Sequence, residues 1–132
     1  MNVHELKIVH ILALKIFTYI KKGGVIVYNV VKRDGKLVSF DLSKISEAIQ
    51  SAFEACQRQF NQDIIDFLAL KVTAEFEPKI EDNKIEVEHI QDSVESVLIQ
   101  AGYADVAKAF ILYRKQREKM RNMKSTILDY KD

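Results

Sequence analysis

The architecture of this chain is set most clearly by Val30-Val31-Lys32-Arg33-Asp34-Gly35-Lys36. β-branched residues lead into Asp34-Gly35, and a second short apolar run leaves it. Asp-Gly accepts the positive φ angles of a type I′ turn, so the pair predicts a hairpin with a two-residue loop. In that register Arg33 lies directly across from Lys36, and like charges opposed on paired strands are destabilising. A bound polyanion would turn this cost into an attraction, whereas a solvated hairpin tip is the simpler interpretation of these seven residues alone.

Helical periodicity dominates the sequence after the hairpin. Four helices are predicted. The first begins after Asp41 or Ser43, and the others run from about Asp63 to Phe76, from Glu88 to Gln100, and from Asp105 to about Met123. Pro78 is predicted to stop the second helix, and Gly102 is a predicted C-cap of the third. Between these two helices, Glu81-Asp82-Asn83 is a predicted turn, and apolar and charged residues alternate over 84–87 as in a short third strand. The predicted fold is therefore α+β: a four-helix bundle capped by a small sheet of two or three strands.

The expected core follows from the same periodicity. Apolar residues recur on one face of each predicted helix. The expected core residues are Phe40, Ile45, Ile49, Val94 and Phe110, and Leu112 and Met120 are expected to face inward from the last helix. Cys56 belongs to one of these apolar faces and is expected to be a buried small hydrophobe, not a reactive thiol.

Composition bounds the class of protein. The chain has 132 residues, enough for one domain with one core, and 48% hydrophobic with 30% charged residues is typical of a globular protein. Lys and Arg total 20 against 19 Asp and Glu, and a net charge of +1 argues against a general nucleic-acid binder. Any anion site must therefore be local. One cysteine excludes an intramolecular disulfide and a zinc ribbon, and suits a reducing cytoplasm.

Residues 1–24 differ in character from the rest. The apolar run from Ile8 to Ile20 is too short and too interrupted to span a bilayer, and no signal-peptide cleavage site follows it. One interpretation is a short helix that packs on the domain or on a partner. The favoured hypothesis is an over-extended gene start, with translation beginning at Val27. The predicted division is residues 1–24 as an extension, 25–122 as the domain, and 123–132 as the start of a linker.

Enzymatic patterns are missing from the sequence. It contains no nucleophile elbow, no Walker P-loop and no paired histidines at metal-binding spacing. His89 is expected near the start of a helix, where a solvated role is the default. The chain is therefore expected to bind a ligand and not to catalyse a reaction by itself.

Two segments carry a resemblance to a known family. The first is the hairpin with Phe40, Lys44-Ile45 and Ala48-Ile49, and the second runs from Val87 through Ile90-Gln91-Asp92 to Leu112-Tyr113-Arg114. Over roughly residues 27–120 the chain resembles the ATP-cone, the allosteric nucleotide-binding module at the N-terminus of many ribonucleotide reductases. The tail resembles more weakly the linker of anaerobic, class III reductases. The resemblance implies ATP or dATP as allosteric ligand, with Mg²⁺ as an optional companion of the nucleotide.

The predicted nucleotide site combines physical chemistry with this resemblance. Triphosphates require clustered cations beside an apolar slot, and Lys32, Arg33 and Lys36 lie together at the hairpin tip. Lys44 lies in the first turn of a helix, where a cation opposes the helix dipole, so it is a candidate phosphate ligand. The resemblance implies that Val30, Lys32, Arg33 and Lys44 contact the nucleotide, with the base between the hairpin and the first two helices. Arg114 either faces the site or makes a surface ion pair.

Alternative functions stay open at this stage. A nucleotide-sensing transcriptional regulator would carry a zinc ribbon, whose four cysteines are absent from this sequence. A ligand-free helical interaction module would leave the basic hairpin solvated. The expected partners are an adenine nucleotide and either the reductase catalytic part or a second copy of the chain, with no nucleic acid and no membrane. The expected contact face is the exposed surface of the last helices, around Arg114, Arg117 and Arg121.

Overall fold

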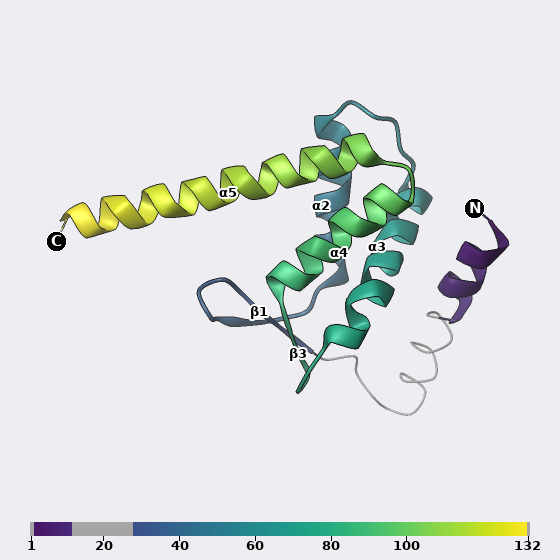
Figure 1. Ribbon diagram of the computed structural model, residues 1–132, viewed down its shortest axis with the longest axis horizontal. Helices are drawn as coiled ribbons and strands as arrows, with labels where there is room; N and C mark the ends of the chain where they lie inside the picture. The colour runs from purple at the N-terminus through teal and green to yellow at the C-terminus, as the bar shows by residue number, and fades with distance from the viewer. Residues whose placement is uncertain (1, 12–27, 132) are drawn as a thin grey trace.

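The computed structural model describes residues 2–11 and 28–131, and within them the predicted α+β fold is confirmed. Four helices form a bundle with a three-stranded sheet at one end (Figure 1). The helices are α2 (Leu42–Ala55), α3 (Gln62–Phe76), α4 (Val87–Gln100) and α5 (Ala104–Lys131). The strands are β1 (Asn29–Val31), β2 (Leu37–Ser39) and β3 (Lys84–Glu86), and a short 3₁₀ turn, η1 (Glu77–Lys79), follows α3. Pro78 lies in this turn, where the helix was predicted to stop.

Local sequence sets where the helices begin and end. Asp41 caps α2, because its Oδ1 accepts a hydrogen bond from the backbone N–H of Ser43 at 3.0 Å. Gly102 has a φ of +90° just after α4. Its own N–H and the next one donate back to carbonyls of the last turn at 3.1 and 2.8 Å, which is a Schellman motif. The predicted cap and stop signals are therefore confirmed.

The hairpin loop differs from the prediction by one residue. The N–H of Lys32 donates to the carbonyl of Lys36 at 2.8 Å, so the loop has three residues, 33–35. The N–H of Gly35 donates to the carbonyl of Lys32 at 2.9 Å, and Gly35 has a φ of +85°. A turn followed by a left-handed glycine is the usual geometry of three-residue hairpin loops. The predicted two-residue loop is wrong, and Lys32 instead of Arg33 lies across from Lys36.

The sheet joins the hairpin to a distant part of the chain. β1 is the central strand; it pairs antiparallel with β2 and parallel with β3. A parallel pair needs a crossover connection, and here α2 and α3 supply it. Val30 pairs with Ile85, and both side chains are buried, at 8% and 2% exposure. The third strand is thus part of the fold, and it fixes the hairpin beside the first turn of α4.

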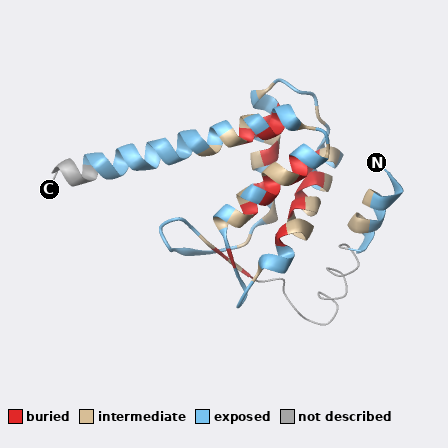
Figure 2. Cartoon of the chain, viewed as in Figure 1, coloured by how far each residue is buried: buried red, intermediate tan, exposed pale blue. Residues whose placement is uncertain are grey.

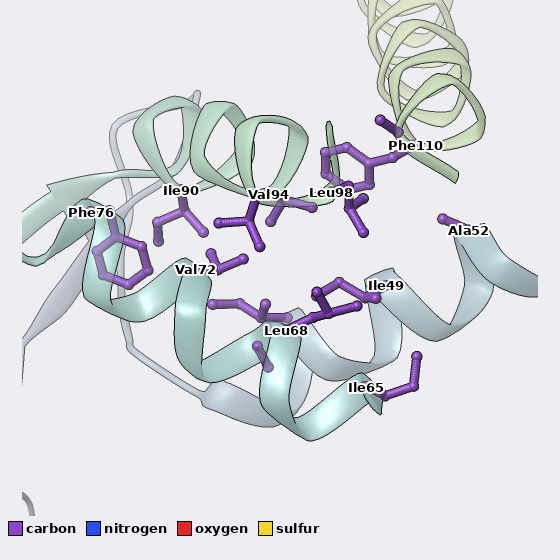
Figure 3. Packing of buried hydrophobic residues seen from close by; sticks show 14 of the residues in the cluster. Ile49, Ala52, Ile65, Leu68, Val72, Phe76, Ile90, Val94, Leu98 and Phe110 are labelled. Carbon is purple, nitrogen blue, oxygen red and sulfur yellow. The ribbon is translucent and has the colours of Figure 1, made fainter. Parts of the chain in front are cut away.

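The core lies between the four helices (Figures 2 and 3). The predicted core positions Ile45, Ile49, Val94 and Phe110 are buried, and Phe40 packs partly buried against them. Cys56 is only partly buried, at the end of α2. Other fully buried side chains include Phe53, Phe76, Ile65, Leu68 and Leu98. Continuous burial of this kind makes the helices a rigid support for the hairpin.

Helix α5 runs far beyond the bundle (Figure 1). It was predicted to end near Met123 and continues to Lys131. Every residue from 115 to 127 is exposed, as the pale blue half of the helix in Figure 2 shows. Leu112 and Met120 are 52% and 62% exposed, so their predicted inward orientation is wrong. Met120 lies where the helix has left the other helices. Leu112 instead lies on the outward face of the part that still packs on them, between the buried Phe110 and Arg114, which pairs with α4.

Residues 3–11 are also helical and contact α3. The carboxylate of Glu5 lies 3.7 Å from Nζ of Lys71, and the two side chains are only 24% and 16% exposed. Ile8 and Val9 on this helix are partly buried. This arrangement agrees with the interpretation of a short helix packed on the domain. The proposed start at Val27 and most of the apolar run lie outside the described residues.

Candidate functional site

A cleft of about 560 Å³ opens between the hairpin and helices α2 and α5. Its size lies within the range of ligand pockets, roughly 300–1,000 Å³. Small side chains on α2, namely Ala48, Ser51 and Ala52, leave room opposite Phe110 and Tyr113 of α5. The wall is therefore apolar and partly aromatic, which suits a planar organic group.

The rim of this cleft is positively charged. Lys32 from the hairpin, Lys44 from the first turn of α2, and Arg117 from α5 all line it. Glu47 is the single carboxylate among the lining residues, and its Oε2 lies 4.0 Å from Nζ of Lys44. The side chain of Lys44 is 75% exposed, so it is free to move toward a ligand. The nearly neutral chain thus concentrates positive charge at one place, as a local anion site requires.

Arg33 does not line the cleft; it contacts α4. Its Nη1 donates to Oε1 of Glu88 at 2.9 Å, and its Nη2 donates to Oε1 of Gln91 at 2.9 Å. The Arg33 side chain is 28% exposed and that of Glu88 is 53% exposed. The side chains of two neighbouring hairpin residues therefore point to different places: Lys32 lines the cleft, and Arg33 bonds to α4. Arg33 as a phosphate ligand stays a prediction.

Two other predicted contacts also lie outside the cleft. Lys36 is 80% exposed, and its Nζ lies 3.9 Å from Oδ2 of Asp34 within the same loop. Val30 lies in the central strand β1, and its side chain is buried as part of the core. Helix α3 contributes no lining residue to the cleft, although the base was predicted to rest against the first two helices and Val30. The base position is therefore still a prediction.

Arg114 makes ion pairs between helices. Its Nη1 lies 3.2 Å from Oδ1 of Asp92 and also bonds Oε1 of Glu95, and its side chain is 18% exposed. Burial by itself would lower the pKa of Arg114, but the hydrogen bonds and charges of Glu95 and Asp92 outweigh it and raise the pKa. The sequence left open whether Arg114 faces the nucleotide site or makes an ion pair, and in the structure it makes an ion pair. Arg114 holds α5 against α4.

The sequence interpretation offered Arg114 from the last helix and missed the α5 residues that do line the cleft, among them Tyr113 and Arg117. Arg117 follows Tyr113 by one turn, and its guanidinium lies 6.0 Å from the ring centroid. Small residues on both sides, Ala52 on α2 and Ala109 on α5, could have signalled a space between these helices.

Metal-binding groups and membrane spans are two kinds of site that residues 2–11 and 28–131 do not contain. No group of three or more His, Cys, Asp or Glu side chains is placed to hold a metal ion in these ranges. In the same part of the chain, every helix is too short or too polar to cross a membrane. The basic cleft is the candidate site because cations from three separate elements line it.

Comparison with known proteins identifies the family. The model of the ATP cone domain matches residues 28–119. The chain is 36% identical over 102 residues to the ribonucleoside-diphosphate reductase subunit alpha of Chlamydia muridarum, which covers 71% of this chain and 10% of that protein. It is 40% identical over 100 residues to the vitamin B12-dependent ribonucleoside-diphosphate reductase of Thermoplasma acidophilum, a match that covers 72% of this chain and 12% of that protein. It is 33% identical over 90 residues to the anaerobic ribonucleoside-triphosphate reductase of Escherichia coli, a match that covers 68% of this chain and 12% of that protein.

These relatives are much longer proteins, and the chain spans only about a tenth of their length. Their names include an anaerobic and a vitamin B12-dependent reductase, so the similarity follows the domain and not one reductase class. The matched region contains the whole sheet, α2 to α4 and the half of α5 that packs on the bundle. The chain belongs to the ATP cone domain family.

Proposed function

We propose that this chain is an allosteric domain that binds ATP or dATP and regulates a ribonucleotide reductase, without catalysing a reaction by itself. The observation that carries the proposal is the cleft beside the hairpin. Lys32, Lys44 and Arg117 come from three separate elements and converge on one hollow with an apolar wall. Family membership supplies the ligand class, because relatives that share this domain are named as ribonucleotide reductases.

The phosphate chain of the nucleotide binds at the rim, between Lys32 and Lys44. Two ammonium groups can donate several charge-assisted hydrogen bonds to phosphate oxygens, and Glu47 alone opposes the ligand charge. Mg²⁺ accompanies the triphosphate and offsets part of the repulsion from that carboxylate. Because the site is open to solvent, binding in the micromolar range is expected, about −8 kcal/mol.

The regulated partner is the catalytic part of a reductase, or a second copy of this chain. Helix α5 offers a contact face, since it is exposed from residue 115 to 127. Arg121 lies on this exposed part, and Arg117 lies where it borders the cleft. Arg114, which was predicted on the same face, is instead tied to α4. ATP and dATP differ by one hydroxyl, so contact alone discriminates them by about 1 kcal/mol. Assembly amplifies such a small difference if the two nucleotides favour different packings.

Two measurements on the full chain test this function. Calorimetry with ATP, dATP and GTP should give micromolar affinity for the adenine nucleotides and weaker binding of GTP. Light scattering should then give different assembly sizes with saturating ATP and saturating dATP. Equal affinity for all three nucleotides would refute the proposed adenine specificity. If none of the three nucleotides gives a binding heat, the proposed nucleotide function is refuted.

A further inference from the structure

The side chain of Arg33 forms a two-pronged contact between the hairpin and α4. One guanidinium nitrogen donates to Glu88 and another to Gln91, each at 2.9 Å, across a sequence separation of more than fifty residues. Glu88 and Gln91 lie on the same face of α4, in its first turns. The contact therefore closes the hairpin tip onto the helix, next to the cleft that Lys32 lines.

Glu88 and a phosphate group are competitors for the same guanidinium. Both present oxygen pairs that match the planar fork of an arginine. The Glu88 side chain is 53% exposed, and exposed ion pairs are weak and exchange readily with other anions. Gln91, the second partner, is neutral and holds Arg33 by a hydrogen bond alone.

The loop geometry allows this exchange without unfolding the hairpin. Backbone hydrogen bonds between Lys32 and Lys36, and between Gly35 and Lys32, fix the turn whatever the side chain of Arg33 does. Arg33 is the first loop residue, directly after Lys32. The Arg33 side chain can therefore leave α4 while the hairpin backbone stays in place, and the residue before it, Lys32, lines the cleft.

We infer that Glu88 and Gln91 hold Arg33 in the empty domain, and that a triphosphate displaces them. The inference rests on the proposed function, since the competing anion is the phosphate chain of the nucleotide. Glu88 thereby weakens nucleotide binding, and binding releases the hairpin tip from α4. Glu88 is a positioning residue, because it acts on the ligand through Arg33.

The test compares two charge-neutral variants of the full chain. Glu88→Gln keeps the shape of the side chain and removes the competing charge. Glu86→Gln is the matched control, because Glu86 is exposed, lies two residues away, and has no ion pair among the described residues. Calorimetric titration with ATP should show about three- to fivefold tighter binding for Glu88→Gln, which is the upper range for an exposed ion pair. Glu86→Gln should change the Kd by less than about twofold, because exposed charges are screened by salt.

A double-mutant cycle with Arg33→Ala identifies the route. Arg33→Ala should weaken ATP binding, and adding Glu88→Gln should then produce no gain. The amide resonances of the Gln91 side chain should shift when ATP is added to the wild-type chain and stay unchanged when it is added to Arg33→Ala. Thermal melts of all variants show whether each is folded.

The outcomes separate this inference from the proposed function. If the wild-type chain binds ATP but Glu88→Gln binds no more tightly than Glu86→Gln, the competition is refuted and the nucleotide function stands. Weaker binding by Glu88→Gln would also refute it, because Glu88 would then hold the hairpin in its binding geometry. If the wild-type chain binds no triphosphate, both proposals fail.

Discussion

Replacing Lys32 with alanine should weaken ATP binding, whereas the same change at Lys36 should leave it nearly unaltered. The two lysines lie across from each other on the hairpin, bonded through their backbones. Lys32 lines the cleft, while Lys36 is 80% exposed and lies near Asp34 of its own loop. The variants therefore remove the same charge from the same hairpin and differ only in whether the side chain reaches the cleft.

The expected loss of affinity follows from the phosphate bond proposed for Lys32. A hydrogen bond to a charged group contributes about 1.5–3 kcal/mol net, which corresponds to a Kd increase of roughly 10- to 150-fold. At Lys36 only the screened long-range charge is lost, and surface substitutions of this kind stay within about 0.5 kcal/mol, or roughly twofold. Neither change should alter folding, because both side chains lie outside the core.

Isothermal calorimetry of the full chain with ATP, at about 0.15 M salt and again at higher salt, measures both effects. Circular dichroism melts check that the variants are folded. Equal losses at Lys32 and Lys36 would mean that the hairpin attracts phosphate only through its overall charge. No loss at either position would place the triphosphate away from the hairpin and refute the site.

Three further predictions concern stability. Phe53→Ala should lower the free energy of unfolding in urea by about 3–5 kcal/mol, since Phe53 is fully buried; a loss below 1 kcal/mol would contradict the assigned core. Lys71→Met should cost about 0.5–1 kcal/mol, because Glu5 then loses its partner, and an unchanged value would mean that the N-terminal helix does not dock there. Asp41→Ala should lower the melting temperature at neutral pH. Hydrogen bonds from Ser43 hold the pKa of Asp41 below its usual 3.8, so the wild-type advantage should shrink as the pH falls below 3.8; a constant difference would refute the cap.

The fold was predictable because its signals are local. Asp41 caps the helix that follows it, Pro78 ends α3, and Gly102 ends α4 with the left-handed geometry expected of it. Each of these residues acts on backbone groups within a few positions. The parallel pairing of β1 with β3 was not predicted, because it joins strands more than fifty residues apart.

The loop and the last helix show where local signals are ambiguous. Asp34-Gly35 fits a two-residue loop and a three-residue loop equally well, since both need a positive φ at the glycine. The choice depends on register, and it decides that Lys32 instead of Arg33 lies opposite Lys36. Helix α5 outlasts its apolar pattern because charged residues such as Arg121 and Lys124 are good helix formers without any core contact.

The sequence predicted two of the three cations that line the cleft, and it did not predict how the elements assemble around them. Lys32 and Lys44 were chosen by charge and position, and both line the cleft. Arg117 was missed as a lining residue because its place depends on how α5 crosses α2. The partners of Arg33 could not be read from the sequence either, since Glu88 is 55 residues away.

The most direct test of the account is calorimetry of the full chain with ATP, repeated with Lys32→Ala. The account predicts one adenine triphosphate bound per chain with micromolar affinity, and a Kd at least about tenfold higher in the variant. Wild-type binding that the variant retains unchanged would contradict the site, and no binding of ATP or dATP by the wild-type chain would contradict the function itself.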